Sequence, residues 1–299
     1  MAIVRRGGIG TYFCVIAGAA ALAGVLGAEV ARRIARRLET QSPSTEREIA
    51  PSELGVPYDE VWFCTSDGLR LNGWWLARAG AERTVVTMTG HHGRRSQTVG
   101  VAVALWERGA NVLMFDYRGR GASDPSPNTL GYHETTDALS AVEYAATRAP
   151  GLPLGLVGYS MGGAVAIMAA AGDARVGAVV ADSPFASQRK VIRRHFRARS
   201  GLPAFPLSNL MERFLSYDVA LVEPIREIGR IAPRGVMLIH GGLDAVTDPL
   251  DSQRLYEAAG EPKEMWALPS VAHCRAYFED TEMYVERIAS FLARSLARA

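Results

Sequence analysis

Short apolar runs alternate with helix-like stretches over most of the chain. The apolar runs predict buried β-strands, and they cover residues 84–89, 111–115, 154–157, 176–181, 236–239 and 265–268. Apolar residues at helical spacing predict helices between most of these runs, at 98–108, 134–148, 164–171, 252–259 and 284–296. Continuous buried strands separated by helices favour an α/β fold, with a mainly parallel central sheet and helices on both faces.

A β-hairpin and a long insertion complete this pattern. Two β-rich runs, 60–65 and 69–75, flank Asp67-Gly68, and an Asp-Gly pair between such runs is a strong hairpin signal. We expect this hairpin to add an antiparallel edge to the sheet. Residues 185–234 contain no strand-like run and are rich in Arg and Pro, so we expect a helical cap inserted between two strands.

The first 39 residues have a different character from the rest of the chain. Residues 7–28 are 22 consecutive uncharged positions, preceded by Arg5 and Arg6. A helix of that length can cross the hydrocarbon layer, so we predict an uncleaved single-pass membrane anchor. The alternative is a cleaved signal peptide and a secreted protein, because Ala19 to Ala23 provides small-x-small cleavage sites. Arginines on both sides of the span leave its orientation open.

Residues 40–57 predict a linker, because they contain three prolines and many Ser, Thr and Glu residues. The predicted organisation is therefore an N-terminal segment at 1–39, a linker at 40–57 and one α/β domain at 58–299. The cap would occupy about 185–234 of that domain.

Composition excludes several classes of protein. A hydrophobic fraction of 48% rules out a disordered chain, and a net charge of +2 does not point to a nucleic-acid partner. Three cysteines without zinc-site spacing predict neither a disulfide framework nor a structural metal. The adjacent His91 and His92 lack a cluster of Asp, Glu or Cys ligands, and no phosphate-cradling motif occurs. We expect no metal and no cofactor.

The most informative segment is 156–165, where an apolar strand leads through Gly158-Tyr159-Ser160-Met161-Gly162 into an Ala-rich helix. A Gly-x-Ser-x-Gly turn between a strand and a helix exposes the serine Oγ, and its glycines avoid clashes where the backbones crowd. The backbone N–H of the next residue then points at a developing oxyanion. We therefore predict Ser160 as a nucleophile and the Met161 amide as an oxyanion donor.

A serine nucleophile needs a histidine base, and enzymes with this turn supply the acid and then the histidine further along the chain. Asp244 lies just past the strand at 236–239, and His273 follows the last strand. We predict that Asp244 orients His273 and stabilises its imidazolium. Two competing acids are expected elsewhere: Asp248 as a helix N-cap and Asp251 as a solvated carboxylate.

The second oxyanion donor is expected after the strand at 84–89. The loop there is Gly90-His91-His92-Gly93-Arg94. We predict that the backbone N–H of Arg94, just after His92-Gly93, is this donor.

The sequence resembles the α/β-hydrolase superfamily, and most closely the bacterial membrane-tethered hydrolases of serine-aminopeptidase-like or prolyl-oligopeptidase-like type. The resemblance runs from about position 56 to the C-terminus and rests on Gly158-Tyr159-Ser160-Met161-Gly162, His92-Gly93, Asp116-Tyr117-Arg118-Gly119-Arg120-Gly121, His240-Gly241-Gly242-Leu243-Asp244 and Ala272-His273. It implies the fold, a Ser-His-Asp triad and hydrolysis by acyl transfer, and it implies no particular substrate.

The predicted function is a serine hydrolase that cleaves a carboxylic ester through an acyl-enzyme intermediate. A short peptide or amide is the alternative substrate, and an acyltransferase would use the same triad. A further alternative is a non-catalytic, membrane-tethered binding protein that retains the fold. The sequence leaves these alternatives and the oligomeric state open.

Overall fold

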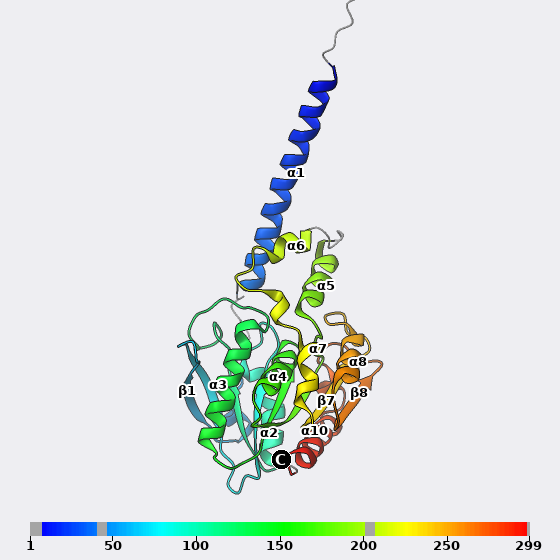
Figure 1. The fold of residues 1–299 in the computed structure, drawn as a ribbon. Coiled ribbons are helices and arrows are strands. Elements are labelled where there is room, and N and C mark those ends of the chain that lie inside the picture. The colour runs from blue at the N-terminus through cyan, green and yellow to red at the C-terminus, as the bar shows by residue number, and fades with distance from the viewer. Residues whose placement is uncertain (1–7, 41–46, 201–206, 298–299) are drawn as a thin grey trace, which may run out of the picture.

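The computed structural model describes residues 8–40, 47–200 and 207–297, and its centre is an eight-stranded sheet (Figure 1). The strand order is β1-β2-β4-β3-β5-β6-β7-β8. The β1–β2 hairpin and the β2–β4 pair are antiparallel, and all pairs from β3 to β8 are parallel. The strands are β1 (Asp59–Cys64), β2 (Arg70–Leu76), β3 (Arg83–Met88), β4 (Ala110–Phe115), β5 (Leu154–Tyr159), β6 (Val176–Asp182), β7 (Gly235–Gly241) and β8 (Lys263–Leu268).

Burial explains the two strand patterns in the sequence. β4, β6 and β7 are buried at every position, because helices cover both faces of the sheet, and their sequences are therefore continuous apolar runs. At the edge, β1 alternates, with Val61 and Phe63 buried between exposed neighbours. The predicted α/β fold with an antiparallel edge hairpin is confirmed.

Helices pack on both faces of the sheet. One hydrophobic cluster joins one face to α3 (Tyr132–Arg148), α4 (Met161–Gly172) and α8 (Pro249–Ala258). A second cluster joins the other face to α2 (Val99–Glu107), α9 (Ala276–Glu279) and α10 (Thr281–Leu296). This arrangement leaves the carboxyl ends of the parallel strands free to carry functional loops, as is usual in α/β folds.

The chain between β6 and β7 forms the predicted helical cap. Its described residues contain no strand, and their elements are α5 (Gln188–Ser200), α6 (Leu207–Glu212), η3 (Val219–Leu221), α7 (Pro224–Glu227) and η4 (Ile228–Ile231). Figure 1 shows α5 and α6 beyond one end of the sheet, beside the C-terminal part of α1 (Gly8–Glu39).

The C-terminal half of α1 packs on this cap. Ala31 and Ala35 lie one helical turn apart and are fully buried. They share a hydrophobic cluster with Ile192 and Phe196 of α5 and Met211 of α6. Small side chains on one helix face allow this close approach, so this part of the predicted N-terminal segment is a component of the cap.

The predicted membrane anchor at 7–28 is not supported. In the part of the chain that the structure describes, no helix is both long and apolar enough to cross a bilayer. The described side chains of α1 include Glu29, which pairs with Arg32 and Arg33 at 2.6 and 2.7 Å. Residues 1–7, and the side chains of most residues as far as position 23, lie outside the described part.

The predicted linker is partly ordered against the domain. Residues 41–46 lie outside the described part, but η1 (Pro51–Leu54) follows and Pro51 is buried. Glu48 accepts hydrogen bonds at 3.1 Å from the guanidinium groups of Arg94 and Arg95. The domain limits drawn from the sequence stay a prediction, although these contacts extend the packed region to Glu48.

Candidate active site

Ser160 occupies a tight turn between β5 and α4. Its φ is +54°, a backbone conformation that a residue with a side chain adopts only when the surroundings impose it. The Ser160 N–H donates to the Asp182 carbonyl at 2.8 Å, which ties the turn to β6. A Cβ on Gly158 would lie 2.1 Å from the Gly162 carbonyl oxygen, so the first glycine of the motif is required by contact.

Asp244 and His273 meet at the carboxyl ends of β7 and β8. His273 Nδ1 lies 2.6 Å from Asp244 Oδ2. The other carboxylate oxygen, Oδ1, accepts the backbone N–H groups of Val246 and Thr247 at 2.7 and 2.9 Å. The turn that follows β7 therefore fixes the direction in which Asp244 presents its carboxylate.

The carboxylate of Asp244 is held in its charged form. Burial raises the pKa of Asp244, but hydrogen bonds from His240, His273 and Thr247 outweigh burial and bring this pKa well below its ordinary value. A buried, ionised acceptor at Nδ1 selects the His273 tautomer in which Nε2 is free to take a proton.

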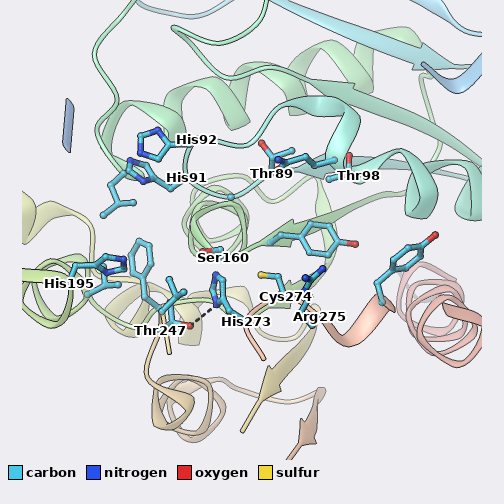
Figure 2. Close-up of a pocket in the computed structure, with 18 of the residues that line it drawn as sticks. Thr89, His91, His92, Thr98, Ser160, His195, Thr247, His273, Cys274 and Arg275 are labelled. Atoms are coloured by element: carbon cyan, nitrogen blue, oxygen red, sulfur yellow. Dashed lines mark hydrogen bonds between the residues drawn. The ribbon is translucent and has the colours of Figure 1, made fainter. Parts of the chain in front are cut away.

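Ser160 and His273 line the same cavity, and Figure 2 shows the His273 ring beside Ser160. The predicted acid is in direct contact with that ring. The structure thus brings Ser160, His273 and Asp244 together, although 84 and 29 positions separate them along the chain. Met161, the predicted first oxyanion donor, begins α4 directly after Ser160.

Arg94 lies away from this cavity, so its prediction as the second oxyanion donor is not supported. Its side chain turns toward Glu48, and the next residue's N–H donates to Asp116 Oδ1 at 2.8 Å. A turn closed by Gly93 N–H on Gly90 O, with His92 at φ +64°, leads the chain away from Ser160.

Gly90, rather than Arg94, lies next to Ser160. A Cβ on Gly90 would be 3.3 Å from the Ser160 Cβ, and Gly90, His91 and His92 line the cavity. The next backbone N–H along the chain belongs to His91, which also lines the cavity. Gly90, the first glycine after the strand, is the sequence signal that marks this position, whereas Gly93 closes the turn.

The cavity has a volume of about 660 Å³ and is largely apolar. On the cap side its walls come from α1, from the loop before α3 and from the start of the cap, and comprise Leu38, Leu130, Phe185, Val191 and Ile192. On the opposite side they come from α2 and α9, and include Val101, Tyr277 and Phe278.

His91 adds a neutral imidazole to this cavity. Burial, helped by the nearby charges of His92 and Arg120, lowers the pKa of His91 well below its ordinary value. In the described residues, no group of three or more His, Cys, Asp or Glu side chains is arranged to hold a metal ion.

The structure confirms the predicted role of Asp248 and corrects that of Asp251. Asp248 is the N-cap of α8, as predicted, because its side chain accepts the Leu250 N–H. Asp251 is 3% exposed rather than solvated; it accepts the Ala186 N–H at 3.2 Å and pairs with Arg254 at 2.8 Å. This carboxylate connects α8 to the cap, and its position within the helix gave no sign of that contact.

Comparison with known proteins identifies the family. The family model described as "Serine aminopeptidase, S33" matches residues 79–223. The uncharacterized protein Rv2307c of Mycobacterium tuberculosis is 32% identical over 237 residues, which cover 77% of this chain and 78% of that protein. The uncharacterized protein YfhR of Salmonella typhi is 30% identical over 258 residues, which cover 80% of this chain and 82% of that protein. This chain belongs to the α/β-hydrolase superfamily.

A solved structure gives the same assignment. The esterase Pf2001 of Pyrococcus furiosus superposes with a TM-score of 0.73 and 25% identity, over 86% of this chain and 100% of that chain. The resemblance to the α/β-hydrolase superfamily, inferred from the sequence motifs, is therefore confirmed. The chain is a hydrolytic enzyme of the α/β-hydrolase superfamily.

The close contact at the serine turn gives a prediction for two glycines of β5. Gly158→Ala places its Cβ against the fixed backbone of Gly162, whereas the close contacts of Gly155→Ala are with the ends of the Leu292 and Leu296 side chains. We expect Gly158→Ala to lower the free energy of unfolding by at least about 2 kcal/mol, and Gly155→Ala by less than about 1 kcal/mol. Urea unfolding measures both, and equal midpoints for the two variants would contradict the described turn.

Proposed function

We propose that this α/β-hydrolase cleaves carboxylic esters with uncharged, largely apolar acyl groups, through an acyl-enzyme on Ser160. The observation that carries the proposal is the convergence of a strained serine turn and a histidine–carboxylate pair in one apolar cavity. A nucleophile, a base and a buried orienting acid at one site form the arrangement that acyl transfer requires.

The proposed reaction has two halves. Ser160 Oγ attacks the ester carbonyl carbon while His273 Nε2 takes the hydroxyl proton, and the carbonyl oxygen becomes an oxyanion. The backbone N–H groups of Met161 and His91 hold that oxyanion. When the C–O bond to the alcohol breaks, His273 returns its proton to the leaving alkoxide. Water, deprotonated by His273, then attacks the acyl carbon; the bond between that carbon and Ser160 Oγ breaks, and His273 returns the proton to Oγ as the acid leaves.

The chemistry of the cavity wall favours an ester over an aminopeptidase substrate. An aminopeptidase binds a substrate's free ammonium group, and a carboxylate is the side chain suited to that charge. The described residues that line the cavity include no Asp and no Glu, whereas they include Arg275 and several histidines. A peptide with a free N-terminus would find no acidic partner there, and an apolar acyl chain would contact Leu130, Phe185 and Ile192.

A substrate panel tests the proposed reaction. Wild-type enzyme is expected to hydrolyse p-nitrophenyl esters faster than aminoacyl p-nitroanilides. Ser160→Ala is expected to lower kcat/KM for the ester by at least about 10³-fold, because the covalent route is removed. Ser290→Ala, on α10 outside the cavity wall, is the matched control and should retain activity. Wild-type-like ester turnover by Ser160→Ala, or faster cleavage of the anilides, would contradict the proposal.

A second prediction concerns the contribution of α1 to acyl specificity. Leu38 lines the cavity, whereas Leu26 on the same helix is 58% exposed and does not. Leu38→Trp would fill the cap side of the cavity, so we expect kcat/KM for an octanoyl ester to fall about tenfold relative to an acetyl ester. Leu26→Trp should leave this ratio unchanged. An unaltered ratio in Leu38→Trp would show that acyl chains do not reach α1.

A further inference from the structure

A second histidine, buried in the core of the protein, contacts the carboxylate of Asp244. His240 lies in β7, is 2% exposed and does not line the cavity. Its Nε2 lies 3.1 Å from Asp244 Oδ2, the same oxygen that His273 contacts at 2.6 Å. Its Nδ1 lies 2.6 Å from the hydroxyl of Ser252 in α8. Both ring nitrogens therefore have a partner within the core.

We propose that His240 is a positioning residue, which donates from Nε2 to Asp244 Oδ2 and sets how strongly that carboxylate holds a proton on His273. The inference rests on the proposed function, since it assigns a partner to the acid of that site. His240 does not line the cavity, so it acts through Asp244 and through Thr247, whose Oγ1 lies 3.4 Å from His240 Nε2.

The groups that contact the imidazole ring of His240 determine which of its nitrogens carries a hydrogen. Asp244 Oδ2 is an acceptor, so Nε2 of His240 carries the hydrogen, and the Nδ1 lone pair accepts the Ser252 hydroxyl. Ser252 is fully buried, and this contact fixes the rotation of the ring. The imidazole, held by its contact with α8, thus directs one N–H toward the acid.

His240 influences His273 because both residues contact the same carboxylate oxygen of Asp244. Asp244 Oδ2 receives hydrogen bonds from His273, from Thr247 Oγ1 at 2.7 Å and from His240. Each donor withdraws negative charge from that oxygen, and less charge then stabilises the imidazolium of His273. Removal of the His240 donor should therefore let His273 keep its proton to a higher pH, and should also loosen the carboxylate.

The other charged groups around His240 are paired. On β6, Asp182 accepts from Ser183 Oγ at 2.8 Å and Tyr284 Oη at 2.9 Å, and burial raises its pKa. On α8, Asp251 pairs with Arg254. Arg194 of α5 donates to the Asp244 carbonyl at 3.4 Å and lies 4.0 Å from the Asp248 carboxylate. Asp244 and His273 are therefore the titratable groups that a change at His240 affects most directly, and Asp182 lies within electrostatic range of both histidines.

Three variants test this role in the full chain. His240→Leu removes the donor; His240→Gln retains an amide N–H that can reach the Nε2 position; Ser252→Ala removes the contact that orients the ring. We expect His240→Leu to lower kcat for p-nitrophenyl acetate about tenfold with little change in KM. The acidic limb of its pH–rate profile should move up by about 0.5 to 1 pH unit. His240→Gln should restore most of the wild-type kcat and of the wild-type pH profile. Ser252→Ala should give values between those of the wild type and His240→Leu.

A readout that does not need activity separates this inference from the proposed function. The protonation of His273 is followed by ¹⁵N NMR of labelled histidines, assigned with His273→Gln, and its midpoint should rise in His240→Leu and return in His240→Gln. An unchanged midpoint in folded His240→Leu and Ser252→Ala, with active wild type, would overturn the role of His240 alone. Absence of Ser160-dependent ester hydrolysis in the wild type would overturn the proposed function instead.

Discussion

The buried carboxylate of Asp244 is the group on which the candidate site depends. A charge removed from water is stable only when hydrogen bonds replace its hydration. Asp244 receives five: two from backbone N–H groups of its own turn, one from Thr247 and two from histidines. These contacts come from β7, from the loop after it and from the loop after β8, so satisfying one carboxylate fixes the positions of several segments.

The cavity above the carboxylate is built from segments that are distant in sequence. The sheet supplies Ser160 and His273 at its carboxyl ends, the cap supplies Val191 and Ile192, and α1 supplies Leu38. Apolar walls exclude water, and electrostatic interactions within such a site are stronger than in solvent. Because α1 packs on α5 and α6 through Ala31 and Ala35, the N-terminal helix and the cap form one wall of the site.

Features of the fold and the site could be predicted from the sequence mainly where the residues that form them are close together along the chain. The sheet, the serine turn and Asp248 as a helix cap depend on neighbours along the chain, and the sequence patterns predicted them. Asp244 and His273 could also be predicted, because parallel strands place their carboxyl ends at one edge. The packing of α1, the buried Asp251 and the contact of His240 with Asp244 depend on elements far apart in sequence. Local pattern carries no information about those contacts.

The loop that contains Arg94 shows that prediction from sequence can also fail over a few neighbouring residues. Two glycines follow β3, and the sequence does not show which of them approaches Ser160 and which closes a turn. The ion pairs with Glu48 and the N–H contact with Asp116 decide this, since they hold Arg94 and Arg95 away from the cavity.

In the proposed reaction, Ser160 attacks a carbonyl whose oxygen is held by backbone N–H groups at the serine turn and after β3. A crystal structure of the protein inactivated by an alkyl phosphonate tests it most directly. We expect a covalent P–Oγ bond at Ser160, with the phosphoryl oxygen within about 3 Å of the Met161 and His91 nitrogens. A phosphonate attached to another residue, or a phosphoryl oxygen that faces neither amide, would contradict it.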